Sequence, residues 1–290
     1  MFESEIQILI GGLLLGGIYA IVAFGLSVIY GVSRVLNLAH GDLLMLGAFI
    51  TFFIFSHFEI NPFLILVILI PLFFVIGSVF EKSLIRPLMK RPLHTAMVGT
   101  VLVTLGVALA LEDVTFYFTK TDVGVSYYLP SVNIANITIS SVRLAALILV
   151  MLLAVSLHIL LKKTLMGKAI RAVTEDKESS IMVGINISRV SMVTFGIGTA
   201  LAATGGLFFI MISTASSFIG LPWTVKALMI IILGGLGSLL GSLAGGLILG
   251  LAENFTAYYI GIHWSPQVAL IMLLVILVIR PRGLFGIPAK

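Results

Sequence analysis

Long apolar runs, separated by short polar segments, are the feature that most constrains the fold of this chain. A helix needs about 20 mostly apolar residues to cross the hydrocarbon core of a bilayer. Only 10% of the residues are charged and the mean hydropathy is +1.21, whereas a soluble domain carries about 25% charged residues. The sequence therefore predicts an all-α, polytopic bundle of membrane helices. Seven runs are predicted to span the membrane: 6–30, 42–57, 62–81, 95–118, 142–161, 189–212 and 266–281.

An eighth apolar region, 225–252, contains the glycine-rich stretch LGGLGSLLGSLAGG. Glycine tolerates the backbone angles of a tight turn, and non-helical backbone occurs at membrane depth only where protein or a water-filled cavity surrounds it. We expect two half-helices, about 225–235 and 238–252, that enter from the outer face and return to it. The alternative is one long span followed by a cytoplasmic loop. In all, we expect about 8 transmembrane segments, with interrupted or re-entrant helices among them.

Basic residues indicate how the spans are oriented, because Lys and Arg gather in cytoplasmic loops. We take 31–41, 82–94, 162–188 and the C-terminal tail as cytoplasmic. With Arg189 at the next helix start, that side carries fourteen basic residues: Arg34, Lys82, Arg86, Lys90, Arg91, Lys162, Lys163, Lys168, Arg171, Lys177, Arg189, Arg280, Arg282 and Lys290. The other side carries three: Lys120, Arg143 and Lys226. We therefore expect a single transmembrane domain over 1–290, with its N-terminus outside the cell membrane and its C-terminus in the cytoplasm.

Several classes of site are absent from the sequence. The net charge of +5 is explained by the loops and does not indicate nucleic-acid binding. The chain has no cysteine, which excludes disulfides and thiolate metal sites. His40 has no second histidine at ligand spacing, so we expect no metal. There is no Walker A motif, because Gly167-Lys168 is followed by Ala169. We expect no cofactor and no enzymatic activity, and any ATP must be bound by a partner chain.

The segment 162–188 is the longest and most charged of the proposed cytoplasmic loops. Thr174 can act as an N-cap, with Glu175 and Asp176 in a first turn favoured by the helix dipole. Gly184 stands where a glycine would end the helix. The pattern predicts a short helix of about nine residues.

One edge of this short helix is apolar, since it carries Ile181, Met182 and Ile185. Such a helix can be a peg for another protein, or it can lie on the lipid headgroups. The pattern alone does not favour either.

Polar residues cluster where two apolar runs are interrupted, and they are candidates for a translocation path. The candidates are Ser33, Asn37, His40, Asp42, Gly235, Gly237 and Ser238. Asp42 begins a helix, where a carboxylate can complement the dipole, or it can line a substrate route. Arg34 is expected to be a cytoplasmic anchor, and Glu253 a solvated residue near the outer face.

Small residues recur at four-residue steps in two regions. Gly12, Gly16 and Ala20 form one series, and Gly237, Gly241 and Gly245 form another. Such ridges let helix backbones approach closely, either inside one bundle or at a dimer seam. A possible internal repeat relates Gly31, Gly41 and Leu43 to Gly235, Gly245 and Leu247 at one constant offset, as in transporters built from repeats with interrupted helices.

Four separated motifs resemble the LivH-type permease of branched-chain amino acid ABC transporters. They are GLSVIYGVSRVLNLAHGDLLMLGAF, GKAIRAVTEDKESSIMVGINISRV, LGGLGSLLGSLAGGLILG and LVILVIRPRGLFG. The resemblance covers about 5–288 and makes 162–188 the loop that couples to an ATPase. Its coupling residues would be Gly167, Arg171, Ala172, Thr174, Glu175, Asp176 and Gly184. One departure is Ser180, where the family usually has alanine.

The resemblance implies a heteromeric, ATP-driven importer in the lipid bilayer. A second, LivM-like permease, two cytoplasmic ATP-binding subunits and an extracytoplasmic solute-binding protein would be its partners. The cargo would be leucine, isoleucine or valine, and the alternative is the same machinery carrying urea, amides or other amino acids. An intramembrane enzyme or a self-sufficient channel is a rival class, but it needs a nucleophile, metal or selectivity ring that the sequence lacks.

Overall fold

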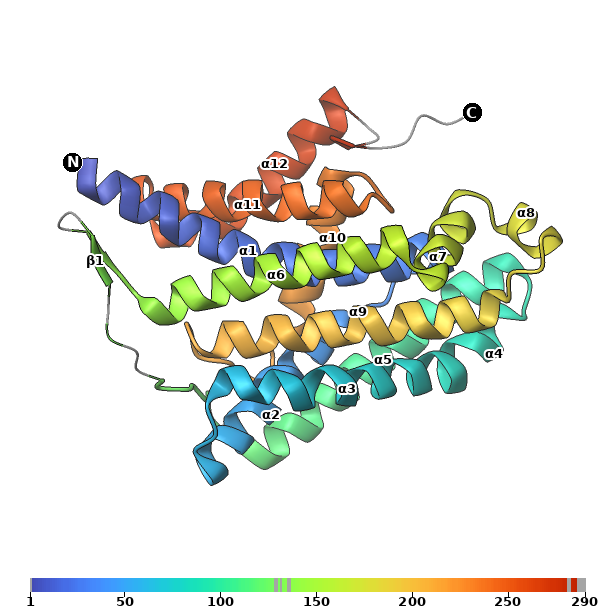
Figure 1. The fold of residues 1–290 in the computed structure, drawn as a ribbon, viewed down its shortest axis with the longest axis horizontal. Coiled ribbons are helices and arrows are strands. Elements are labelled where there is room, and N and C mark those ends of the chain that lie inside the picture. Colours follow the sequence, from blue (N-terminus) through green and yellow to red (C-terminus); the bar gives the residue numbers. More distant parts are fainter. Residues whose placement is uncertain (1, 128–129, 131, 135–136, 281–282, 286–290) are drawn as a thin grey trace.

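Helices make up nearly all of the structure (Figure 1). The computed structural model describes residues 2–127, 130, 132–134, 137–280 and 283–285. Its helices are α1 (Phe2–Ser33), α2 (His40–Phe58), α3 (Pro62–Phe80), the π-helix η1 (Glu81–Ile85), α4 (Arg86–Met89), α5 (Leu93–Thr119), α6 (Ser141–Lys163), α7 (Leu165–Glu175), α8 (Lys177–Met182), α9 (Ile187–Ile210), α10 (Gly220–Gly234), α11 (Leu239–Tyr259), the 3-10 helix η2 (Ile262–Trp264) and α12 (Ser265–Ile279). The strands β1 (Val132–Ile134) and β2 (Ile137–Ile139) form a small antiparallel hairpin. Arg282 and Lys290, counted above as cytoplasmic, lie outside the described residues.

Eight helical segments of the described residues are long and apolar enough to cross a membrane. They are Glu5–Ser33, His40–Phe58, Pro62–Met89, His94–Thr119, Leu144–Lys163, Ile187–Ile210, Leu240–Tyr259 and Ile262–Ile279. Seven of them correspond to the runs predicted from hydropathy, so the expected polytopic all-α bundle is confirmed. The eighth is α11. The apolar helix α10 has only 15 residues, which is short of the length that a full crossing needs.

The glycine-rich region is interrupted where the sequence predicted it. The turn Gly235–Ser238 separates α10 from α11, and Gly235 and Gly237 adopt positive φ angles of 107° and 80°. Ser238 then caps α11 by accepting a hydrogen bond from the Gly241 amide at 3.1 Å. Only glycine reaches such angles without strain, which explains why the break falls here.

The depth of this turn differs from the expectation. α11 has 21 residues and runs antiparallel along α1, with Ser238 beside Ser27 and Asn254 beside Ile8. It is therefore a full-length helix, and the prediction of a half-helix is wrong for it. The small residues of α11 pack against α1 along the whole length of α11, and this packing stabilises a helix that continues past mid-depth. The chain after α12 returns to the turn, where the Leu284 amide donates to the Leu233 carbonyl at 2.9 Å.

Two helix pairs are related by inverted topology. α1 and α9 are antiparallel, since Gly25 lies against Gly198 and Gly205 against Val22. Each is followed by a non-helical break and then by a helix, α2 or α10, that starts in the middle of the bundle. The related segments are therefore α1–α2 and α9–α10, and not the segments around Gly31 and Gly235 that the sequence suggested. With 29 glycines in the chain, matching glycines at one offset is weak evidence for a repeat.

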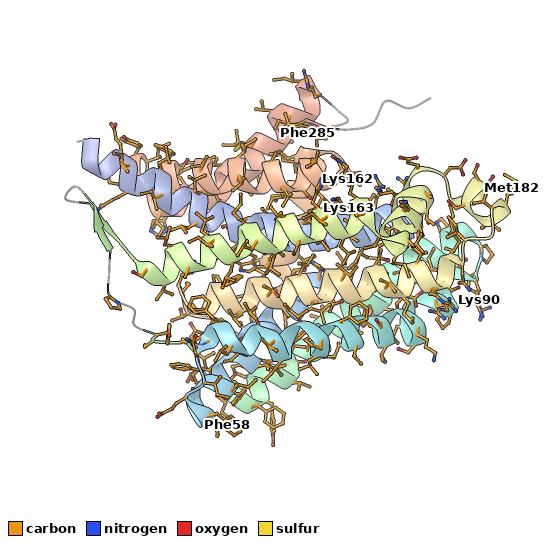
Figure 2. All side chains as sticks on the ribbon, in the orientation of Figure 1. Phe58, Lys90, Lys162, Lys163, Met182 and Phe285 are labelled. Carbon is orange, nitrogen blue, oxygen red and sulfur yellow. The ribbon has the colours of Figure 1, made fainter. Side chains whose placement is uncertain are left out.

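Basic residues are brought together at one end of the bundle, here called the basic end and defined by Ser33, Arg86, Lys162, α7 and α8. Arg34 donates to the Thr174 carbonyl at 2.8 Å, and Arg171 donates to the Lys162 carbonyl at 3.3 Å. Figure 2 shows Lys90 and Met182 at this end and Phe58 at the opposite one.

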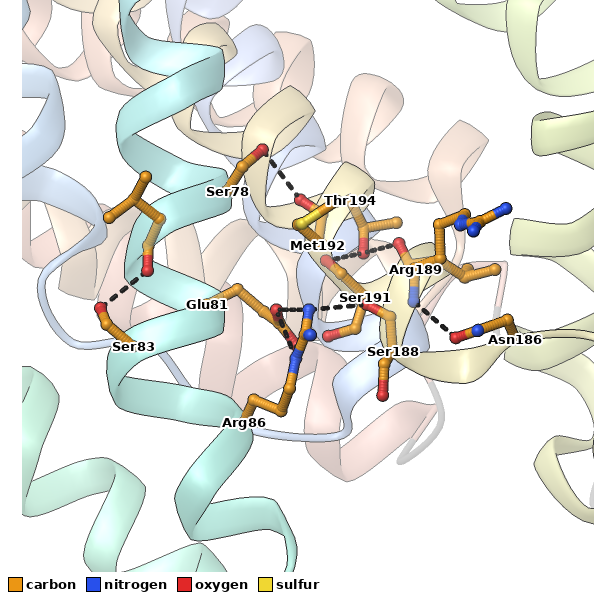
Figure 3. Close-up of polar contacts among 12 residues, drawn as sticks. Ser78, Glu81, Ser83, Arg86, Asn186, Ser188, Arg189, Ser191, Met192 and Thr194 are labelled. Carbon is orange, nitrogen blue, oxygen red and sulfur yellow. Dashed lines mark hydrogen bonds and ion pairs between the residues drawn. The ribbon is translucent and has the colours of Figure 1, made fainter.

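A partly buried ion pair fixes the π-helical turn after α3 to α9 at the basic end (Figure 3). Arg86 approaches Glu81 to 2.6 Å and also donates to the Ser188 carbonyl at 3.1 Å. Glu81 is only 2% exposed, and Arg86 is its ion-pair partner. The pair lies across the π-helical turn, a local widening often found at functional positions.

Close backbone contact holds α1 against α11. A methyl group added at Gly12 would lie 2.9 Å from the Leu251 Cα, and one added at Gly16 would lie 2.8 Å from the Leu247 Cα. Helices in lipid gain little from the hydrophobic effect, so such close packing has to supply much of their association. Of the two alternatives for the small-residue ridge of α1, the structure therefore shows packing inside one bundle and not at a dimer seam.

We predict that Gly16→Val lowers the thermal stability of the detergent-solubilised protein, because the added carbons would force α1 away from α11. Overpacking of this kind costs about 1–3 kcal/mol. The control is Gly106→Val on α5, since a Cβ at Gly106 meets no atom within 4 Å. Equal melting temperatures for the two variants would contradict the assigned packing.

Candidate functional site

The starts of α2 and α10 meet in the middle of the bundle. The Gly41 amide donates to the Thr224 hydroxyl at 2.7 Å, and that hydroxyl donates to the Leu38 carbonyl at 2.9 Å. A Cβ on Gly41 would collide with the Gly220 carbonyl, so the two helix starts touch through their backbones. The positive dipole ends of both helices therefore face one shared region.

Three predicted path residues lie in this region and are fully enclosed. The His40 Nε2–H donates to the Val22 carbonyl at 3.0 Å, and Asn37 accepts from the Ala39 amide at 3.2 Å. The Asp42 carboxylate lies against Gly220 and has no hydrogen-bond partner among the described residues. Asp42 therefore does not cap α2 by hydrogen bonding, and the local field of the two helix starts is the favourable interaction left for its charge.

The remaining path candidates lie elsewhere. Ser33 is buried and donates to the Ile29 carbonyl at 2.7 Å, so it closes the end of α1. Gly235, Gly237 and Ser238 form the α10–α11 turn at the basic end. The predicted path set is thus divided between the middle of the bundle and its basic end.

The turn borders a cleft of about 320 Å³ between α1, α6 and α7. Its polar lining comes from Ser27, His158, Lys162, Arg171, Thr174, Glu175 and Ser238. Thr174 also lies within reach of both Gly31 and Gly237. The surface segment α7 is therefore in direct contact with the two interruptions of the bundle that reach the basic end.

The loop 162–188 contains two helices where the sequence predicted one. Thr174 lies in the last turn of α7, where its hydroxyl donates to the Ile170 carbonyl at 2.8 Å. The predicted N-cap at Thr174 is wrong, because Gly167, Ile170 and Val173 form a buried face that continues the helix to Glu175. Ala172 lies on the same helix, half-buried, and its carbonyl accepts from the Asp176 amide.

The N-cap of α8 is Asp176. Its carboxylate accepts from the Glu178 and Ser179 amides at 2.9 and 3.1 Å and from the Ser179 hydroxyl at 2.5 Å. Gly184 has a φ of +84° and ends the helix. The Gly184 amide donates to the Ile181 carbonyl, and the Ile185 amide donates to the Ser180 carbonyl. That bond pattern is a Schellman motif, so the expected glycine stop is confirmed.

The outer edge of α8 is apolar and unpartnered within the described chain. Ile181, Met182 and Val183 are 56%, 80% and 76% exposed. Ile185, which was predicted on the same edge, lies beyond α8 and is half-buried against the core. Gly167 anchors the other side of the loop, because a Cβ there would overlap the Leu160 and Leu161 carbonyls. A firmly held base and an exposed apolar tip suit a docking element.

Sequence reasoning missed a buried charged cluster that joins α1, α10 and α11. Lys226 lies 3.0 Å from Glu253 and 2.6 Å from the Tyr19 hydroxyl, which donates to Glu253 at 2.6 Å. Glu253 is 2% exposed, so the expectation of a solvated residue is wrong. The sequence did show two ionisable residues, at 226 and 253, in an apolar region, and this could have suggested a buried pair. Their contact itself depends on the turn between α10 and α11, which the sequence does not place in space.

We predict that Asp176→Ala speeds hydrogen exchange at the amides of 178–182, whereas Asp176→Asn has a smaller effect because its side-chain oxygen still accepts. The hydrogen bonds from Ser179 and then Glu178 lower the pKa of Asp176 below its ordinary value. The charged cap is therefore favourable above the unfolded-state pKa, near 3.9 for a free aspartate, and is lost as pH falls through the lower folded value. Mass spectrometry of labelled peptides checks this, and equal exchange in both variants at pH 7 would contradict the cap.

Comparison with known proteins identifies the family. The family model described as "Branched-chain amino acid transport system / permease component" matches residues 8–279. The high-affinity branched-chain amino acid transport system permease protein LivH of Escherichia coli K12 is 28% identical over 302 residues, covering 99% of this chain and 97% of LivH. BraD of Pseudomonas aeruginosa, named in the same way, is 29% identical, covering 98% of this chain and 96% of BraD.

A more distant relative is archaeal. The probable branched-chain amino acid transport permease protein LivH of Methanocaldococcus jannaschii is 24% identical, with 99% of this chain and 94% of that protein covered. No solved structure matches the chain. Since the family model covers nearly every helix described above, this chain belongs to the permease components of branched-chain amino acid transport systems.

Proposed function

We propose that this chain forms the membrane path of an ATP-driven importer for leucine, isoleucine and valine. The observation that carries the proposal is the family match over 8–279. Relatives named for branched-chain amino acid transport align over nearly their whole length, 97% and 96%. The chain supplies the permease, and it does not need catalytic groups of its own.

The partners follow from the same proposal. A second, LivM-like permease would complete the path, and an extracytoplasmic solute-binding protein would deliver the amino acid. Two cytoplasmic ATP-binding subunits would hydrolyse ATP. The exposed tip of α8 supports docking of one of them. α8 is capped and follows a helix, α7, that packs on the bundle, so its apolar edge is held in place to bind a groove of a partner.

The coupling set would act through contact between α7 and the interrupted helices. Thr174 lies beside Gly31 and Gly237 and accepts a hydrogen bond from Arg34. Movement of α8 by a closing ATPase pair would therefore reach the end of α1 and the α10–α11 turn through packed atoms. In this account Arg171, Glu175 and Asp176 shape the loop and do not contact the cargo.

We expect Met182→Asp to abolish ATP-driven leucine uptake by the reconstituted complex and to reduce co-purification of the ATPase subunits. The carboxylate would put a charge into the apolar contact. Phe58→Asp is the matched control, because Phe58 is also exposed but lies at the opposite end of the bundle. Normal uptake and normal ATPase recovery in Met182→Asp would refute docking at α8. Failure of the unaltered complex to carry any branched-chain amino acid would refute the function itself.

The orientation is also proposed: the basic end faces the cytoplasm, as the positive-inside bias favours. The chain has no cysteine, so single cysteines can report it directly. In right-side-out vesicles, a membrane-impermeant maleimide should label Phe58→Cys and should label Met182→Cys only after the vesicles are opened. The reverse labelling pattern would invert the topology.

A further inference from the structure

We propose that the Lys226–Glu253 pair recognises the α-carboxylate and α-ammonium groups of the transported amino acid, which makes this chain selective for zwitterions. The inference rests on the proposed function, because it assumes that an amino acid passes through the bundle. It adds the groups that would distinguish this cargo from a neutral amide or urea.

The first argument is where the pair lies. Lys226 is on the short helix α10 and Glu253 is on α11, and both contact Tyr19 near the middle of α1. Lys226 also lies 4.7 Å from the centre of the Tyr19 ring. Ionisable groups at such depth usually face a partner or a pathway. A pair whose only role was to join helices could be replaced by apolar side chains without loss of stability.

The second argument is incomplete pairing. One Glu253 oxygen, Oε2, accepts from both Lys226 and Tyr19, whereas Oε1 is buried and has no partner among the described residues. Because Oε1 is enclosed, an ammonium group, which has three donors, reaches it only when the Lys226 side chain moves aside. The pair thus holds an unused acceptor for one end of a zwitterion, and this acceptor opens when Lys226 changes partner.

The third argument is access. The Lys226 side chain is 25% exposed although Glu253 is almost fully enclosed. Next to Lys226, the same helix exposes Leu221 and Val225, at 43% and 39%. A carboxylate can therefore reach the Lys226 ammonium from the open side of α10, and an aliphatic side chain can lie against the neighbouring apolar residues. Trp223 closes the enclosed side by packing edge-on against Tyr19, with their ring centroids 5.3 Å apart.

These observations describe an exchange of partners. Without cargo, the cation and the carboxylate neutralise each other. With a zwitterion, Lys226 would bind its carboxylate and Glu253 its ammonium, so each of the four charges would have a partner of opposite sign. A neutral amide offers no charge to either group, and it could not replace the interaction that it breaks.

The test measures selectivity, because a role in stability alone would lower all affinities together. The unaltered permease complex, with its partner subunits but without the solute-binding protein, is placed in nanodiscs and bound to radiolabelled L-leucine. Three competitors are compared with L-leucine: 4-methylpentanoate, which lacks the ammonium; L-leucinamide, which lacks the carboxylate; and 4-methylpentanamide, which lacks both. We expect L-leucine to compete at least about tenfold better than each of them, as charge-assisted hydrogen bonds allow.

Two variants assign the charges. Glu253→Gln should remove most of the preference for L-leucine over 4-methylpentanoate, and Lys226→Met should remove most of the preference over L-leucinamide. The double variant Lys226→Met/Glu253→Gln, which leaves no unpaired buried charge, should bind all four compounds within about threefold of one another. Its melting temperature and its recovery with partner subunits provide the folding control.

Three outcomes would overturn the inference: unchanged selectivity in the variants, a uniform loss of affinity for every compound, or no preference for L-leucine in the unaltered complex. None of these would by itself remove the proposed function, which is judged by ATP-driven leucine uptake with the binding protein present. Absence of that uptake in the unaltered complex would remove both.

Discussion

A single threonine hydroxyl joins the two interrupted helices in the middle of this bundle. Thr224 accepts from the Gly41 amide and donates to the Leu38 carbonyl. In lipid, every backbone polar group needs a partner inside the protein, and each unsatisfied one costs several kcal/mol. Helices that stop at mid-depth therefore need partners for their end groups inside the protein, and here the two helix starts share Thr224. The inverted arrangement of α1–α2 and α9–α10 follows from this requirement.

Close glycine contacts make that meeting point possible. α1 is in backbone contact with α9 through Gly25 and Gly198 and with α11 through Gly12 and Gly16. The central helix α1 is thus clamped on two sides, and Val22 on it supplies the carbonyl for His40. Large side chains at these glycines would separate the helices and leave the breaks exposed to lipid.

The buried carboxylates differ in how their oxygens are paired. Glu81 has a bidentate guanidinium from Arg86 and a fixed place at the basic end. Glu253 has its charge paired on one oxygen only, and Asp42 has no hydrogen bond to either oxygen among the described residues. The role proposed for Lys226 and Glu253 depends on this difference, because a fully paired carboxylate has no acceptor to offer a ligand.

The sequence by itself determined the class of the protein, the runs that span, the break at Gly235–Ser238 and the exposure of Ile181 and Met182 on α8, although not the burial of Ile185. These depend on local properties: hydropathy, the backbone freedom of glycine, and a glycine stop after a short helix. Only the tertiary structure decided that Asp176 caps α8 while Thr174 ends α7, that α11 runs its full length along α1, and that Lys226 and Glu253 are partners. Those outcomes depend on which helices are neighbours. The apolar surface of a helix shows that it will be buried, but it does not show which other helix will cover it.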